Sequence, residues 1–144
     1  MIFFDASAAV KRYFKETGSE LVEELWTRLE TRSSLALLHC ELASALNRKL
    51  RERGISRDAY RDLKNQIQRD IAKLNTIPAD DNLIERCLPL LDVHPLKTLD
   101  TLYLAGALSL QQTSSVSVTF VSADRQLLRA AKAEGLQVID PEAP

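Results

Sequence analysis

The chain has 144 residues, of which 45% are hydrophobic and 27% are charged, and its formal net charge is −1 at pH 7. This length predicts a single globular domain over residues 1–144, with enough apolar side chains for one core. No stretch approaches the roughly 18 apolar residues of a membrane span, and the apolar start ends at Asp5, so we expect no signal peptide, no membrane association and a cytoplasmic location.

The near-neutral charge excludes nucleic-acid binding through an overall positive field, because that mode needs many uncompensated cations. One segment is locally basic. Residues 48–64 contain only three acids, Glu52, Asp58 and Asp62, against seven cations: Arg48, Lys49, Arg51, Arg53, Arg57, Arg61 and Lys64. The pattern favours a solvated pair of helix faces. A surface for RNA or for an acidic protein partner is the alternative.

Short apolar runs alternate with helical patterns in the first half of the chain. Ser19 is expected to cap the second helix, and Gly54 to end the third. We expect strands at 2–4 and 35–37, and helices at 6–14, 19–31, 38–54 and 56–74.

The second half continues this alternation. We expect strands at 76–78, 117–121 and 137–139, and helices at 81–91, 99–110 and 124–134. Strands that alternate with helices call for right-handed crossovers, which predicts a three-layer α/β domain with a mostly parallel sheet covered on both faces. Functional sites in such sheets lie beyond the carboxyl ends of the strands.

Four acidic residues stand out at this edge. Asp5 follows the first strand, Asp124 follows the strand that ends near Val121, and Asp100 opens a helix. Each of these three, taken alone, is better explained as a helix cap. Glu41 lies on or beside the apolar stripe of its helix, where an unpaired carboxylate is costly, so a buried ion pair with Arg48, Lys97 or Arg125 is its alternative explanation.

Carboxylates gathered at one edge repel one another unless cations lie between them. Hard oxygen ligands select Mg²⁺ or Mn²⁺. A zinc site is not expected, because His39 and His94 have no spaced partner, and Cys40 and Cys87 form no metal-binding or disulfide pattern. Two such isolated thiols are typical of small buried groups.

Four segments carry a resemblance to PIN-domain proteins and, more narrowly, to VapC-type toxins of type II toxin–antitoxin pairs. They are IFFDASAAVKRYFKETGSE, HCELASALNRK, HPLKTLDTLYLAGAL and FVSADRQLLRAAKAEGLQVIDP. The resemblance implies a central five-stranded parallel sheet and an endoribonuclease. It identifies the catalytic acids as Asp5, Glu41, Asp100 and Asp124, supported by the hydroxyls of Ser7 and Ser122. Lys97 stands where the family often has arginine, and Ser122 where it often has threonine.

By this resemblance, Asp5 and Asp100 are the principal ligands of Mg²⁺ or Mn²⁺, Glu41 and Asp124 complete the shell, and metal-activated water cleaves the RNA. The implied partners are an RNA substrate, an antitoxin that covers the acidic groove, and a second copy in a homodimer. An RNA-processing nuclease without an antitoxin and a non-catalytic PIN-like binding module are the alternatives. Apolar residues of the first two helices are expected in the core rather than at a partner surface: Tyr13, Phe14, Leu21 and Trp26.

Overall fold

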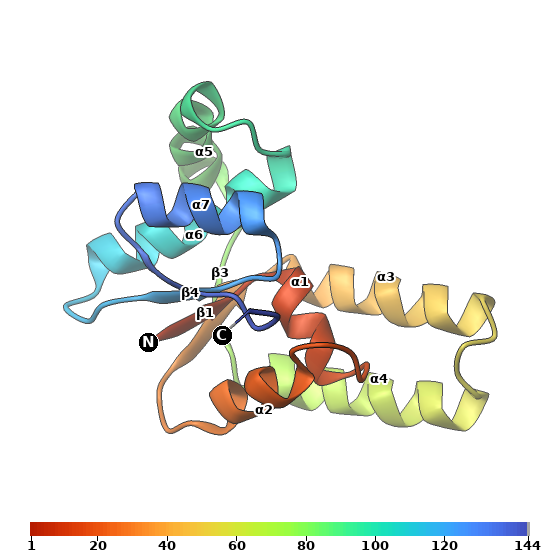
Figure 1. The fold of residues 1–144 in the computed structure, drawn as a ribbon. Helices are drawn as coiled ribbons and strands as arrows, with labels where there is room; N and C mark the ends of the chain where they lie inside the picture. Colours follow the sequence, from red (N-terminus) through yellow and green to blue (C-terminus); the bar gives the residue numbers. More distant parts are fainter. Residues whose placement is uncertain (144) are drawn as a thin grey trace.

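The computed structural model describes residues 1–143, and its centre is a parallel five-stranded sheet (Figure 1). The strand order is β3-β2-β1-β4-β5, so that β1 lies in the middle. All four pairings are parallel. The strands are β1 (Ile2–Phe4), β2 (Arg32–Leu35), β3 (Asn75–Ile77), β4 (Thr119–Val121) and β5 (Gln137–Ile139). The predicted α/β fold is therefore confirmed.

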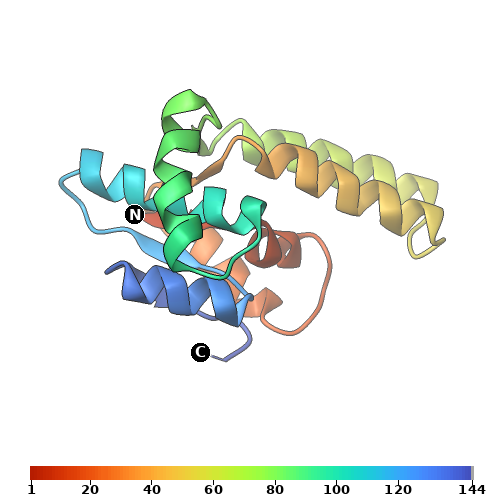
Figure 2. The ribbon, with the colours of Figure 1, turned by 90° about the horizontal axis from the view of Figure 1, so that it is seen from above.

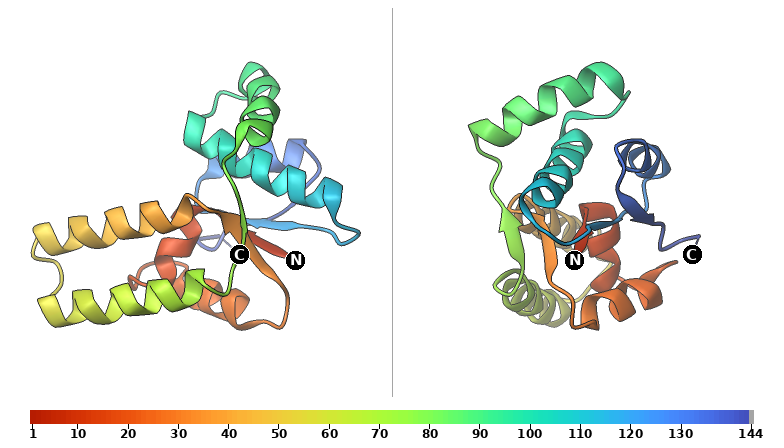
Figure 3. Two further views of the ribbon diagram at one scale, coloured as in Figure 1. Left: turned by 180° about the vertical axis from the view of Figure 1, so that it is seen from behind. Right: turned by 90° about the vertical axis from the view of Figure 1, so that its left-hand side faces the viewer.

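Helices cover both faces of this sheet (Figure 3). The helices α5, α6 and α7 lie on one side, and α1, α2 and α4 on the other. Their bounds are α1 (Ala6–Ala9), followed by a 3-10 turn at Val10–Arg12, α2 (Ser19–Thr27), α3 (Leu38–Arg51), α4 (Arg57–Ile71), α5 (Asp81–Val93), α6 (Thr98–Thr113) and α7 (Arg125–Ala133). Within residues 1–143, no helix is long and apolar enough to cross a membrane.

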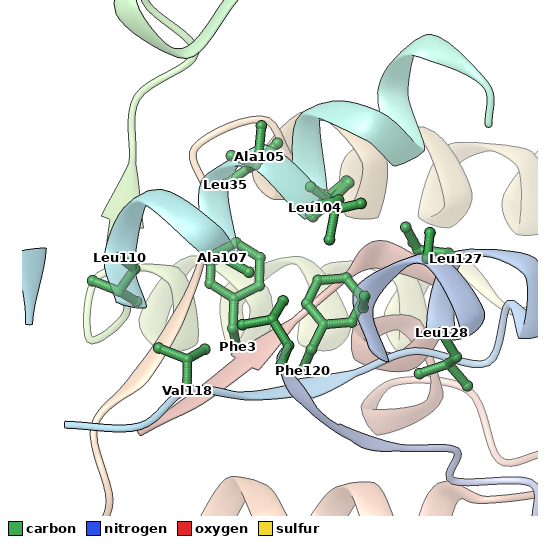
Figure 4. Close-up of a cluster of buried hydrophobic side chains, with 14 of the residues drawn as sticks. Phe3, Leu35, Leu104, Ala105, Ala107, Leu110, Val118, Phe120, Leu127 and Leu128 are labelled. Atoms are coloured by element: carbon green, nitrogen blue, oxygen red, sulfur yellow. The ribbon is translucent and has the colours of Figure 1, made fainter. Parts of the chain in front are cut away.

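Alternating strand side chains divide the core into two clusters. Phe3 and Phe120 point toward α6 and α7, where their rings stack at 5.8 Å between centroids (Figure 4). Phe4 points to the opposite face and packs on Trp26 of α2. Gly106 allows α6 to approach the sheet closely, since a Cβ there would lie 2.7 Å from Leu35 Cδ2. Both sheet faces are thus sealed by apolar contacts.

The helices α3 and α4 form a hairpin that projects beyond the sheet (Figures 1 and 2). Its turn differs from the prediction that Gly54 ends α3. Arg53 takes the left-handed conformation, with φ 55°, and the Gly54 amide donates to the Lys49 carbonyl at 2.9 Å. The left-handed position that favours glycine is therefore filled by the residue before it.

The second strand begins three residues earlier than predicted and ends two residues earlier, at Arg32–Leu35 rather than 35–37. Its polar residues concealed it, because Ser33 and Ser34 are fully buried. The Ser34 hydroxyl donates to the Phe4 carbonyl at 2.7 Å, which compensates its burial. Leu37, predicted in the strand, instead precedes the first turn of α3.

The first two helices are shorter than expected. The helix predicted at 6–14 becomes a 3-10 turn after Ala9, and the one predicted at 19–31 ends at Thr27. Gly18, with φ 87°, is the N-terminal cap in place of Ser19. The Ser19 hydroxyl instead donates to the Phe14 carbonyl at 3.2 Å. The predicted burial of Tyr13 and Trp26 is confirmed.

One polar network fastens the hairpin to the first two helices. The Arg12 guanidinium donates to Asp70 of α4 at 2.9 Å and lies 5.1 Å from the centre of the Trp26 ring. The Tyr13 hydroxyl donates to the same Asp70 oxygen at 3.1 Å. The side chains of Arg12 and Asp70 are each 13% exposed. Loss of Asp70 would leave two mostly buried donors without this acceptor, which is costly.

We therefore expect Asp70→Ala to lower the free energy of unfolding by about 2 kcal/mol. Asp58→Ala is the matched control, because Asp58 also pairs with an arginine, Arg61, but is 82% exposed. The control should change stability by less than about 0.5 kcal/mol. Urea denaturation of the three proteins measures both effects. Equal losses for the two variants would contradict a structural role for the network.

Candidate active site

Asp5 is held at the carboxyl end of the central strand. Its amide donates to the Val121 carbonyl at 3.1 Å, which continues the β1–β4 pairing by one residue. Its side chain caps α1, because Oδ1 accepts from the Ala8 amide at 2.9 Å. Only 4% of the residue is exposed. The carboxylate is therefore fixed by the junction between β1 and α1.

Two serine hydroxyls orient this carboxylate. Ser7 Oγ lies 2.9 and 2.8 Å from the two Asp5 oxygens, and Ser122 Oγ donates to Oδ2 at 2.9 Å. Each hydroxyl oxygen also accepts a backbone amide, Ser7 from Ala123 at 2.9 Å and Ser122 from Asp124 at 3.0 Å. These amides occupy acceptor positions and leave the hydroxyl protons to Asp5. The network joins the β1–α1 junction to the β4–α7 junction.

Burial raises the pKa of Asp5 to about 7. The hydrogen bonds from Ala8, Ser7 and Ser122 oppose this increase, and the nearby negative charge of Asp100 adds to it. A desolvated carboxylate of this kind is stabilised by binding a proton or by a neighbouring cation.

Glu41 lies in the first turn of α3 and is half-buried. Its Oε2 accepts a hydrogen bond from the hydroxyl of Tyr103, a residue of α6 that is 2% exposed. Burial raises the pKa of Glu41, the Tyr103 bond opposes this, and Asp100 raises it further. The predicted alternative, an ion pair with Arg48, Lys97 or Arg125, is wrong: among residues 1–143, Glu41 has no ion pair.

Asp100 occupies the third position of α6 and does not cap it, because Lys97 is the residue at the N-cap. The capping explanation is therefore wrong for this residue. No other described residue within 1–143 donates a hydrogen bond to its carboxylate, so both of its oxygens can accept a ligand. Burial raises the pKa of Asp100, the charge of Asp124 raises it further, and Lys97 lowers it.

Asp124 does cap a helix. Its Oδ1 accepts from the amides of Gln126 at 2.7 Å and Leu127 at 3.1 Å at the start of α7. Capping thus commits one oxygen and fixes the side chain, as it does for Asp5. Within the described part of the chain, its Oδ2 accepts no hydrogen bond and can serve another function.

Asp100 is the centre of the group. Its charge acts on both Asp5 and Glu41, and the charge of Asp124 acts on Asp100. The structure therefore places Asp5, Glu41 and Asp124 each close enough to Asp100 for repulsion between the two carboxylates, with Lys97 as a moderating cation.

The donors available at this edge are carboxylate oxygens, which suit Mg²⁺ or Mn²⁺. Among residues 1–143, no group of three or more His, Cys, Asp or Glu side chains is placed so that it could hold a metal ion. Mg²⁺ does not require one, because it is usually held by one or two carboxylates and keeps several waters. The donor chemistry of the four acids therefore fits such an ion.

A groove of about 310 Å³ lies beside the acids, between α1 and α3. Ser7 and Glu41 line it together with Arg48, which lies two helical turns after Glu41 on the same side of α3. The groove gives an elongated anionic ligand access to the edge of the acidic cluster and offers it a cation.

The sequence did not identify Tyr103 as part of the site. Its position three residues after Asp100 places both side chains on one side of α6, which was the available signal. The pairing of Tyr103 with Glu41 spans 62 positions and could not be found from spacing. Among the thiols, Cys87 is buried as expected, whereas Cys40 is exposed, contrary to the prediction.

Comparisons with known proteins concern the family and the fold of the chain. The family profile of the PIN domain matches residues 2–133. Two proteins of Mycobacterium tuberculosis, Ribonuclease VapC45 and Ribonuclease VapC49, are each 28% identical to the chain over 138 residues, which covers 96% of this chain and 94% of each relative.

Two solved structures share the fold. A chain of FitAcB from Neisseria gonorrhoeae superposes with a TM-score of 0.73 at 15% identity, covering 100% of both chains. PAE2754 from Pyrobaculum aerophilum gives a TM-score of 0.61 at 17% identity, covering 96% of this chain and 83% of the other. At these identities the likeness concerns the fold.

The raised pKa of Asp5 predicts how stability depends on pH when a chelator keeps the protein free of metal. The folded protein binds this proton more tightly than the unfolded chain does, so stability falls as pH rises from about 4 to about 7. Asp5→Asn keeps a cap for α1 but carries no such proton. We expect it to melt at least ~4 °C above the wild type at pH 8 and to lose most of that advantage at pH 4.

Asp92→Asn is the control, because Asp92 is exposed on α5. It should melt like the wild type at both pH values. Thermal melts followed by circular dichroism measure the difference, and a gap between Asp5→Asn and the wild type that does not grow with pH would refute the prediction.

Proposed function

The chain belongs to the PIN-domain family, and on this basis we propose that it is a metal-dependent endoribonuclease that acts as the toxin of a type II toxin–antitoxin pair. The observation that carries the proposal is the group of four carboxylates centred on Asp100. Desolvation raises the pKa of Asp5, Glu41 and Asp100, and a neighbouring carboxylate raises each further: Asp100 acts on Asp5 and Glu41, and Asp124 acts on Asp100. Such a group is unfavourable by itself and becomes favourable when it holds a divalent cation.

We assign Asp5 and Asp100 as the principal ligands of Mg²⁺ or Mn²⁺, with Glu41 and Asp124 completing the shell directly or through water. The bound ion would lower the pKa of a water molecule and stabilise negative charge on the phosphate that is cleaved. This chemistry leads to hydrolysis of an RNA phosphodiester bond.

The protein's own groups have supporting functions. Ser7 and Ser122 hold the Asp5 carboxylate in one orientation, and Tyr103 does the same for Glu41. Asp124 uses Oδ1 to cap α7, which leaves Oδ2 directed by a rigid helix end. These bonds reduce the reorganisation needed when the cation and the substrate arrive.

The toxin assignment rests on the resemblance to VapC-type proteins and on two relatives named Ribonuclease VapC. It implies an antitoxin that covers the acidic groove, an RNA substrate, a homodimer and a cytoplasmic location.

We expect Asp100→Asn to abolish RNA cleavage while the fold is retained, because Asp100 has no structural hydrogen bond to lose within the described residues. A chelator should abolish cleavage by the wild type, and added Mg²⁺ or Mn²⁺ should restore it. The measurement is cleavage of total cellular RNA, with Asp92→Asn as a charge-matched control that stays active. Undiminished cleavage by the folded variant, or in the presence of chelator, would reject the metal mechanism.

Growth is a second readout of the same proteins. Induced expression of the wild type should arrest growth, Asp100→Asn should not, and co-expression of a cognate antitoxin should relieve the arrest. An enzyme that cleaves RNA in vitro but leaves growth unaffected would instead favour an RNA-processing nuclease. A folded protein that cleaves no RNA would favour a non-catalytic binding module.

Tyr103→Phe tests how the site positions Glu41. Removal of the hydroxyl takes away the donor that holds Glu41, so the Mg²⁺ concentration for half-maximal cleavage should rise about tenfold or more. The rate at saturating Mg²⁺ should change much less. Tyr13→Phe also removes a hydroxyl that donates to a carboxylate, that of Asp70, and should leave the Mg²⁺ dependence unchanged. The same Mg²⁺ dependence in both variants would show that Tyr103 does not position a ligand.

A further inference from the structure

A second hollow lies at the far end of the α3–α4 hairpin, away from the acids. Its volume is about 720 Å³. It is lined by the half-buried side chains of Leu50, Ile55 and Tyr60 and by four exposed cations: Arg53, Arg57, Arg61 and Lys64. We call this hollow the basic groove. The hairpin projects from the rest of the domain (Figure 2), and the four cations of the groove are exposed to solvent.

The cations of the basic groove are largely uncompensated. No acidic side chain lines it. Among the residues that the structure describes, one of the four cations is in an ion pair, Arg61 with Asp58, and these side chains are 69% and 82% exposed. Such a pair exchanges readily with water and with other anions. The groove is therefore a concentrated positive surface on a chain whose net charge is −1.

Arg53 gives an independent indication of function. It adopts φ 55°, a conformation that glycine accepts more easily than arginine, although Gly54 is the next residue. Backbone strain at a non-glycine residue is concentrated at functional sites. The turn therefore presents a cation at its strained position, beside the other cations of the basic groove.

The surface chemistry distinguishes between an RNA and an acidic protein as the ligand. Protein interfaces depend on buried apolar and aromatic anchors. The large hydrophobic side chains that are exposed in residues 1–143 all lie outside the hairpin, at Leu29, Ile84, Leu88, Val93 and Val116. The hairpin instead offers cations for phosphates and the half-buried Tyr60 ring on which a base can stack. This combination favours single-stranded RNA.

We propose that the basic groove binds the phosphate backbone of the RNA several nucleotides away from the bond that is cleaved. The proposal rests on the proposed ribonuclease function and identifies how the substrate is held. Arg53 follows Glu41 by twelve positions, and α3 covers the first ten of them, which corresponds to about 15 Å along the helix. At about 3.4 Å per nucleotide this is at least about four stacked nucleotides. Arg48, which lines the groove beside the acids, lies between the two sites.

The test measures RNA binding by Asp100→Asn protein in chelator, so that cleavage does not interfere. Into this background we place the triple change Arg53→Gln, Arg57→Gln and Arg61→Gln. The charge-matched control is Arg69→Gln, Lys73→Gln and Lys132→Gln, three exposed cations outside the basic groove. The probes are labelled single-stranded RNAs of about fifteen and about four nucleotides, followed by fluorescence anisotropy over a range of salt concentrations.

We expect the groove variant to bind the long RNA at least tenfold more weakly than the control. The slope of log affinity against log salt concentration should become smaller in magnitude by about 2, because each of the three lost phosphate contacts on a single strand contributes about 0.7. The short RNA, which cannot reach both sites, should lose much less affinity. Equal affinities and salt slopes for the groove variant and the control would overturn the proposal. A groove variant that binds RNA normally but no longer binds an acidic peptide would overturn it as well.

The single change Arg53→Gly separates function from folding. It should melt at or above the temperature of the parent protein, because it relieves the left-handed arginine, and still bind the long RNA more weakly. Unchanged binding by a folded Arg53→Gly protein counts against the proposal. The two proposals fail in different ways. A protein that binds RNA through the groove but never cleaves it would refute the nuclease function. A protein that cleaves RNA with no contribution from the groove would refute only the proposed RNA binding by the groove.

Discussion

Repulsion among carboxylates at the carboxyl edge of the sheet is the constraint on which the rest of the site depends. Asp5 is almost fully desolvated, Glu41 and Asp100 are half-buried, and the charge of Asp100 acts on both of the others. Asp5 and Asp124 are each fixed by capping a helix, and Glu41 is held by the Tyr103 hydroxyl. Asp100, which has neither within the described residues, is the one that interacts with all of the others. An arrangement that is costly without a cation and is still rigidly supported fits a site built to bind one.

The strand order explains how four distant residues meet. Asp5 directly follows the central strand β1. Its neighbours β2 and β4 are followed by α3, which carries Glu41, and by α7, which Asp124 caps. Asp100 comes from the start of α6, which Gly106 allows to lie directly on Leu35 and Phe3. Close packing of α6 also places Tyr103 against Glu41. The packing of the core and the geometry of the acids are therefore set by the same contacts.

The spacing of apolar residues and the positions of capping residues and glycines predicted the alternation of strands and helices. The parallel sheet followed from that alternation. The bounds of β2 were predicted wrongly because its polar residue Ser34 is buried and bonded to a distant carbonyl. The turn after α3 was predicted wrongly because Arg53, and not Gly54, takes the left-handed conformation. Position along the chain brought Asp5 and Asp124 to one edge. It could not decide between capping and catalysis, because both residues do cap helices in the structure. Nor could it find the Tyr103–Glu41 bond, which depends on the packing of two helices.

The distribution of cations has a physical reason as well. A nuclease of the PIN-domain family must attract a polyanion, but a cation placed among the acids would neutralise them and, under the proposed mechanism, compete with the divalent ion. Lys97, the cation that acts on Asp100, is exposed at a helix start, where solvent weakens its effect. The remaining positive charge of this region is carried along α3 and α4, beginning with Arg48 and increasing toward the end of the hairpin. Distance along a projecting hairpin thus allows one nearly neutral chain to carry both the acidic cluster and the basic groove, and the Arg12–Asp70 contact fastens this hairpin to the body of the domain.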